Sequence, residues 1–168
     1  VEPDHWVLLA TARLWPLCDQ CSPPFPRETL TRHAAKICRR MLDDRPRPGE
    51  RALESGCLTP DGRTCPTATR VEGLTAALTF LPDSEASLRD EIKQTVGEAV
   101  DFLLRSQVRA GPYAGGIPRA VGSNAETPTD SAAQRDAHRR TEIRIDYVQH
   151  ALSAMIQWEQ VNAGDAES

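Results

Sequence analysis

Apolar residues recur every three or four positions along most of this chain, and this helical period constrains the fold more than any other feature. The clearest case is the segment 87–107. Its apolar face carries Leu88, Ile92, Val96, Ala99, Val100, Leu103 and Leu104. No segment shows the strong alternation of apolar and polar residues that marks a half-buried strand. The sequence therefore predicts an all-α protein.

The same period predicts further helices at about 6–17, 27–44, 67–81 and 141–161. Asp4 lies where the first of these helices would take an N-cap. The stretches 45–66 and 108–138 are irregular, with Pro, Gly and polar residues, and are predicted to be long loops. We predict that residues 1–168 form a single helical domain, in which helical hairpins pack together as five or six helices.

Two details of the predicted helices concern their packing. Gly73 lies inside the helix 67–81, where a glycine costs up to about 1 kcal/mol, so it indicates close packing against a neighbouring backbone. The second detail is the predicted core face of the last helix, 141–161. It carries Ile145, Val148, Leu152, Met155 and Ile156.

Charge and hydropathy exclude some classes of partner. The net charge is −4 and no basic stripe with interleaved aromatic residues is present, which argues against a nucleic-acid partner. No apolar run approaches the roughly 20 residues that a membrane span needs, so we predict a soluble protein without a membrane partner. Because the first residue is Val1, we expect a chain trimmed by processing, tagged, or taken from a longer protein, and its compartment stays open.

Five cysteines, an odd number, cannot all pair within the chain. Cys38 falls on an apolar helix face and is predicted to be a small core residue. If the protein is exported, Cys57 and Cys65 would form a disulfide. The same two cysteines could instead form a four-sulfur zinc site with Cys18 and Cys21, but the spacing of Cys57 and Cys65 is unusual for zinc. We predict plain thiols, with neither a metal nor a cofactor.

Three segments resemble parts of the helical (α/α) toroid, a barrel of paired inner and outer helices found in terpenoid cyclases, prenyltransferases and carbohydrate-active toroids. AVDFLLRSQ at 99–107, followed by GGIPRA at 115–120, is similar to the toroid motif in which a helix ends in Gln and a Gly-Gly turn follows. HWVLLATARLW at 5–15 and TATRVEGLTAAL at 67–78 look like inner helices of such barrels.

The resemblance implies a partial α/α toroid, either a fragment, a half-barrel or a shorter relative, because a closed barrel takes many more helices than this chain is predicted to have. Ile117 stands where the family motif has Trp, and no D-x-D-D motif of a cyclase is present. The toroid class hosts many functions, so the fold alone assigns none. A carbohydrate or another extended ligand in the cavity would be the implied substrate.

Glu142, Asp146 and His150 form the first candidate site. At 100° per residue these three side chains lie on one narrow face of the last predicted helix. A carboxylate four residues before a histidine orients the ring for acid–base chemistry, so we name these residues as candidate catalytic groups. The alternative, which we weigh more heavily, is a polar stripe of ordinary helix pairs facing solvent.

Tyr113, Arg119 and Arg70 are the candidate substrate-binding residues. Tyr113 and Arg119 flank the Gly-Gly turn at 115–116, where Tyr113 would stack on a ring and Arg119 would bind a carboxylate or phosphate. Arg70 lies two residues before Glu72, on a different face of the same predicted helix. The alternative is that this turn only closes a helical hairpin, with Tyr113 covering the core.

Two functions are consistent with these sequence features. In the first, the chain is part of an enzyme of the α/α-toroid type that acts on a carbohydrate or another extended ligand. The second is a non-catalytic helical interaction domain that binds a partner protein, or the remainder of a longer chain, in a groove between hairpins. Catalytic signatures such as G-x-S-x-G, the Walker loop and H-E-x-x-H are missing from the sequence. Whether the chain is an enzyme is left open.

Overall fold

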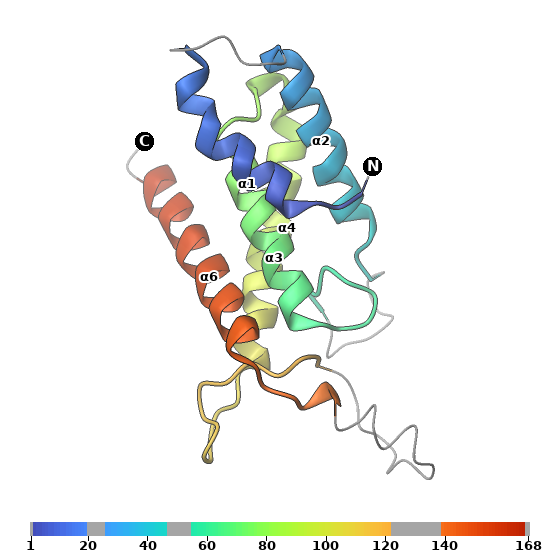
Figure 1. Cartoon of the computed structure of the whole chain (residues 1–168), viewed down its shortest axis with the longest axis vertical. Helices are drawn as coiled ribbons and strands as arrows, with labels where there is room; N and C mark the ends of the chain where they lie inside the picture. The colour runs from blue at the N-terminus through green and yellow to red at the C-terminus, as the bar shows by residue number, and fades with distance from the viewer. Residues whose placement is uncertain (1, 20–25, 47–54, 122–138, 167–168) are drawn as a thin grey trace.

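A computed structural model describes residues 2–19, 26–46, 55–121 and 139–166 of the chain (Figure 1). Within these residues the chain forms five α-helices and no strand, which confirms the predicted all-α class. The helices are α1 (His5–Leu14), α2 (Arg27–Asp43), α3 (Thr64–Ala77), α4 (Ala86–Ser106) and α6 (Ile145–Ala166), with 3-10 helices η1 (Trp15–Asp19) and η3 (Asp83–Glu85). None of these helices is long and apolar enough to cross a membrane.

Local sequence signals explain where the first helices begin. The Asp4 side chain accepts a hydrogen bond from the backbone N–H of Trp6 at 2.9 Å, so Asp4 is the N-cap of α1, as predicted. Pro26 lies immediately before α2, where its missing N–H has no intrahelical partner to lose. These signals are local, and they account for the agreement between predicted and observed starts of α1 and α2.

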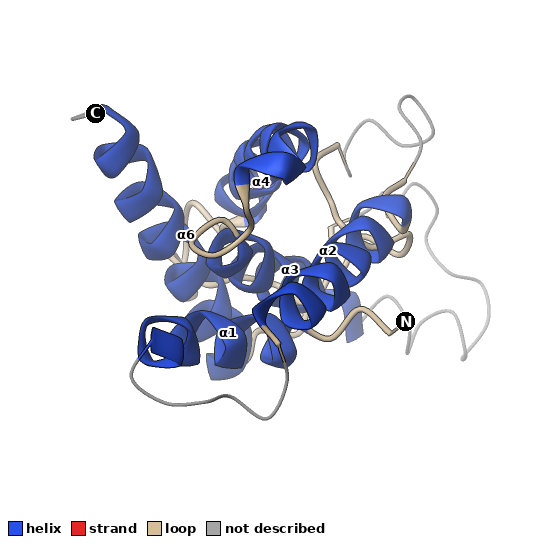
Figure 2. Ribbon diagram, turned by 90° about the horizontal axis from the view of Figure 1, so that it is seen from above, coloured by secondary structure: helices blue, strands red, loops and turns tan. Residues whose placement is uncertain are grey.

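Helix α3 lies at the centre of the molecule, with α1, α4 and α6 packed around it and α2 packed on α3 and α4 (Figure 2). Its side chains are buried along nearly its whole length. The largest fully buried apolar side chains are Leu8, Ile37, Met41, Leu58, Val71, Leu74, Ile92, Val96, Phe102 and Leu103. The central position of α3 means that any side chain it presents to a neighbour is withdrawn from water.

The buried face of α6 differs from the predicted one. Tyr147, Ala151 and Ala154 are buried, whereas Ile145, Leu152 and Ile156, which the apolar pattern places in the core, are exposed. At 100° per residue the two sets lie on opposite sides of the helix. Small alanine side chains let α6 approach α3 closely, and this contact turns the larger aliphatic residues outward. Val148 and Met155 of the predicted face remain partly buried.

Gly73 is the point of closest approach between α1 and α3. A Cβ atom at Gly73 would lie 2.9 Å from Cβ of His5 and 3.3 Å from Cδ1 of Leu8. Real Cβ atoms essentially never show the first of these distances. The prediction that Gly73 permits close packing against a neighbouring backbone is therefore confirmed, and the neighbour is the first turn of α1.

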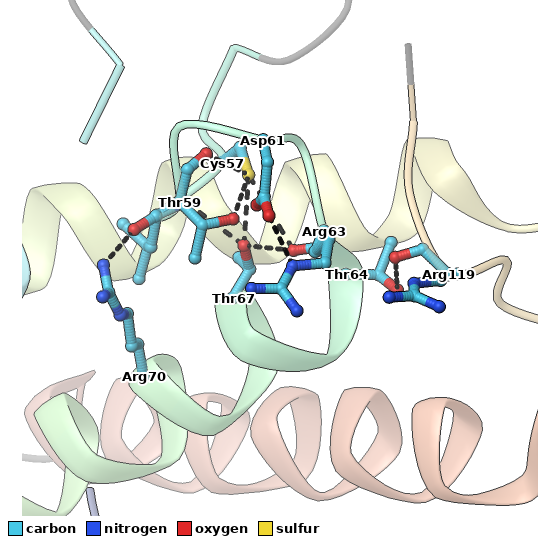
Figure 3. A network of polar contacts seen from close by, with 9 residues as sticks. Cys57, Thr59, Asp61, Arg63, Thr64, Thr67, Arg70 and Arg119 are labelled. Atoms are coloured by element: carbon cyan, nitrogen blue, oxygen red, sulfur yellow. Dashed lines mark hydrogen bonds and ion pairs between the residues drawn. The ribbon is translucent and has the colours of Figure 1, made fainter. Parts of the chain in front are cut away.

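The described parts of the two predicted loops meet at the start of α3. Thr64 donates its backbone N–H to the carbonyl of Arg119 at 3.0 Å, and Val121 donates to the carbonyl of Gly62 at the same distance. The Thr64 hydroxyl also donates to the carbonyls of Pro118 and Arg119, and Figure 3 shows Thr64 beside Arg119. The loop before α3 and the loop after α4 thus hold each other in place.

Candidate binding site between α1, α3 and α6

A buried carboxylate and a histidine form the most unusual polar contact of the structure. Nδ1 of His150 on α6 lies 3.0 Å from Oε2 of Glu72 on α3, and the Glu72 side chain is only 6% exposed. An ionised carboxylate only accepts hydrogen bonds, so Nδ1 carries the hydrogen and donates it. A buried charge needs such a partner, because leaving it unpaired away from water is costly.

His5 on α1 completes a polar cluster with this pair. Its ring centroid lies 6.5 Å from that of His150 in an edge-on arrangement, and its buried Nε2 atom has no hydrogen-bond partner within the described parts of the chain. Burial lowers the pKa of His5 below its ordinary value of 6.5, and the charge of His150 acts in the same direction. Glu72 and Asp4 raise the pKa of His5, but burial is the largest effect. His5 is thus held towards its neutral form.

The lowered pKa of His5 predicts a loss of stability on acidification. Because the unfolded chain binds a proton at His5 more readily than the folded chain, the unfolding free energy falls as the pH drops below 6.5, towards the folded pKa. Urea denaturation of wild type and of His5→Gln, above and below pH 6.5, measures this contribution. The loss of stability should be smaller in His5→Gln than in wild type. The exposed His33 offers the control, and a His33→Gln variant should keep the wild-type pH dependence.

The structure separates the three predicted catalytic residues. His150 pairs with Glu72 of another helix, whereas Asp146 lies 3.1 Å from Nε of Arg144 in an ion pair. Glu142 precedes α6, and its carboxylate lies 3.9 Å from Arg119 Nη1. The predicted helical face with all three residues is therefore wrong for Glu142, because α6 begins at Ile145.

The three predicted substrate-binding residues differ in their surroundings. Tyr113 is 69% exposed at the tip of the turn, so the alternative in which it covers the core is wrong. Arg70 is largely buried, lies 2.8 Å from Asp44 in an ion pair, and donates to the carbonyl of Leu58 (Figure 3). Arg70 therefore ties α3 to the end of α2 and to the loop before α3.

The cysteines that the structure describes are all free thiols: Cys18, Cys38, Cys57 and Cys65. Cys21 lies outside the described residues. The Cys57 thiol contacts Thr59 and Thr67 (Figure 3), and no disulfide joins it to Cys65. Burial raises the pKa of Cys38 to about 12 and also raises the pKa of Cys65, so neither thiol is an activated nucleophile.

A groove of about 500 Å³ lies between α1, α3 and α6, and we call it the α1–α3–α6 groove. Its floor is formed by α3, one wall by α1 and η1, and the other wall by the second half of α6. The lining residues are Leu9, Ala12, Arg13, Trp15, Pro16, Thr75, Ala76, Thr79, Gln157, Gln160 and Val161. Six of these eleven residues are apolar and five are polar or charged, and ligand sites commonly combine apolar surface with polar groups.

The shape of the groove follows from side-chain size along α6. Ala151 and Ala154 let the first half of α6 lie close to α3, whereas the larger Trp158 and Val161 occupy the same side further along. Figure 1 shows α6, in red, diverging from α3 towards its C-terminal end. The groove opens where the two helices diverge.

Thr75 on the floor of the groove has an unusual hydroxyl group. Thr75 is 2% exposed, and its Oγ1 has no hydrogen-bond partner among the described residues. A helical threonine ordinarily bonds a carbonyl three or four residues earlier, as Thr67 and Thr79 do on either side of it. A buried hydroxyl without a partner costs about 1–3 kcal/mol. Because water cannot reach this oxygen, a ligand atom in the groove cannot reach it either, and Thr75 affects stability rather than binding.

The polar cluster and the groove lie on the same faces of the same helices. Glu72 is followed by Thr75 and Thr79 on α3, at the spacing of one helix face. His150 and Gln157 are seven residues apart on α6, which is also one face. The cluster therefore lies about one to two turns from the groove, at the end where α6 is closest to α3.

The sequence pattern points to His150 but not to His5 or the groove residues. Glu72 stands out in the sequence only as a neighbour of Arg70, and nothing in the spacing of His5, Glu72 and His150 predicts that they meet. One signal for the groove is present. The polar face that carries Asp146 and His150 continues through Ser153, Gln157 and Gln160. This face is longer than a stripe of ordinary ion pairs needs to be.

No metal site is formed by the residues that the structure describes, since no group of three or more His, Cys, Asp or Glu residues is arranged to hold an ion. No protein-family model, curated protein or solved structure matches this chain. The fold therefore defines an all-α helical protein, and the groove and the polar cluster are the features that bear on its function.

Proposed function

We propose that this chain is a helical interaction domain that binds a short segment of a partner protein in the α1–α3–α6 groove. The observation that carries the proposal is the groove itself, a hollow of about 500 Å³ between three helices. Its apolar side chains come from all three helices, and Arg13, Gln157 and Gln160 add polar groups that a bound segment would contact.

The dimensions and lining of the groove support a peptide ligand. The α1 wall runs from Leu9 to Pro16, a rise of about 10 Å, which matches roughly three residues of extended chain. Leu9, Trp15 and Val161 offer apolar contact for side chains. The carboxamides of Gln157 and Gln160 match the donors and acceptors of a peptide backbone.

Selection from a random peptide library on the immobilised protein tests the proposal, followed by affinity measurements on variants. Ala76→Trp places a large ring in the groove and should reduce binding of the selected peptides at least about tenfold. Thr75→Val should raise the unfolding free energy by about 1 kcal/mol and leave peptide binding unchanged, because it removes a buried hydroxyl that has no partner among the described residues and that a ligand cannot reach.

Ala10→Trp is the matched control for the blocking variant. Ala10 is exposed on α1 outside the groove lining, so this substitution adds the same ring without filling the groove. Selected peptides should bind Ala10→Trp as they bind wild type. Peptides that bind Ala76→Trp equally well, or a failure to select any peptide, would show that the groove is not the binding surface.

The second candidate is acid–base catalysis by a partial α/α toroid, which the Glu72–His150 pair favours. A carboxylate that holds the ring of a histidine is a common arrangement for a general base. The nearby Cys65 is a poor nucleophile because burial raises its pKa, and the charges of Asp146 and Glu72 raise it further. Binding is therefore the better supported function. A screen of carbohydrate polymers for turnover by the purified protein tests the catalytic alternative.

A further inference from the structure

Arg13 is the only charged residue in the lining of the α1–α3–α6 groove, as far as the described residues form it. Its side chain is exposed, and it forms no ion pair or hydrogen bond with the part of the chain that the structure describes. No acidic residue among the described lining residues lies beside it. The groove therefore combines apolar walls with one positive charge that has no partner among the described residues.

We infer that the partner segment bound in the groove carries an acidic side chain that pairs with Arg13. This inference rests on the proposed function and names the chemistry of its ligand. A guanidinium group recognises a carboxylate through paired N–H donors, which fixes both position and orientation of the acidic residue. Apolar side chains on either side of it would contact Leu9, Trp15 and Val161.

The charge of the whole chain makes this pairing selective. With a net charge of −4, the protein does not attract acidic segments in general. The net negative charge repels an acidic segment, so such a segment binds only where its attraction to Arg13 outweighs this repulsion. Salt screens the repulsion beyond about 8 Å. The pairing with Arg13 therefore sets the register of the bound segment, and the apolar walls provide most of the buried area.

Parallel peptide selections on wild type and on Arg13→Glu test the inference. Peptides selected on wild type should share an Asp or Glu at one position among apolar residues, and should bind Arg13→Glu about tenfold or more weakly. Replacing that acidic residue by Lys in the peptide should restore binding to Arg13→Glu. Lys36→Glu is the control, because it makes the same change of charge at an exposed position on α2, outside the groove.

Two other outcomes separate this inference from the proposed function. If selected peptides require an open groove, as judged by Ala76→Trp, but show no acidic preference or bind Arg13→Glu unchanged, the acidic ligand is wrong and the groove remains a binding site. If Lys36→Glu weakens binding as much as Arg13→Glu, the effect is one of net charge and the pairing with Arg13 is wrong. If no peptide depends on the groove, both proposals fail.

Discussion

Replacing His150 by Ala should lower the unfolding free energy by about 3 kcal/mol, the upper end of the cost of leaving a buried acceptor without its hydrogen-bond donor. The Glu72 carboxylate is nearly inaccessible, and its hydrogen-bond partner is His150 at 3.0 Å. Without the imidazole, the carboxylate stays buried without that donor, or the helices separate to admit water. Urea denaturation followed by far-UV circular dichroism measures the loss.

Two further variants make this prediction specific to the pair. Gln149 is exposed on the same helix, and Gln149→Ala should change the unfolding free energy by no more than about 0.5 kcal/mol. A double variant, Glu72→Leu with His150→Leu, should recover much of the loss, because apolar residues of similar size commonly replace a buried pair without cost. Equal stability of His150→Ala and Gln149→Ala would contradict the view that the pair is energetically coupled.

The second large effect is expected at Gly73, where substitution by Ala should lower the unfolding free energy by about 2 kcal/mol. The added methyl group would lie 2.9 Å from Cβ of His5, so α1 must move away from α3. That movement would also widen the α1–α3–α6 groove, since α1 forms one of its walls. Thermal and urea denaturation measure the stability, and peptide affinity reports the groove.

Gly97 provides a matched control for the Gly73 substitution. Both glycines lie inside helices, but a Cβ atom at Gly97 would meet nothing closer than Trp158, at 3.7 Å, which is ordinary contact. Gly97→Ala should therefore leave stability unchanged or raise it by up to about 1 kcal/mol, through the better helix propensity of Ala. If the two variants prove equally stable, the contact between α1 and α3 is not as tight as the structure shows.

Part of the candidate site could be predicted from the sequence, because some of it is helix geometry. The spacing of Asp146 and His150 places both on one polar face of α6, and the same face continues to Gln157 on the groove wall. The partner of His150 could not be predicted in this way. Glu72 precedes it by 78 residues, and only the packing of α6 on α3 brings the two together.

The buried face of α6 shows where apolar patterning gives the wrong prediction. The larger aliphatic residues Ile145, Leu152 and Ile156 carry the stronger apolar signal, whereas the close contact with α3 is made by Ala151 and Ala154. Alanine contributes little to an apolar pattern, yet it permits the shortest distance between helix axes. Packing against α3 thus decides which face of α6 is buried, and the spacing of apolar residues within α6 does not predict that face.

The all-α class, the approximate positions of the helices, the Asp4 N-cap and the close contact at Gly73 can all be predicted from residue order, because periodicity, capping and the absence of a side chain are local properties. Only the folded arrangement shows that His5, Glu72 and His150 meet, that Arg70 is an internal tie, and that a groove opens beside Arg13. These features depend on how far apart the helices lie and how each is turned about its axis. Both are set by side-chain packing between segments that are distant along the chain.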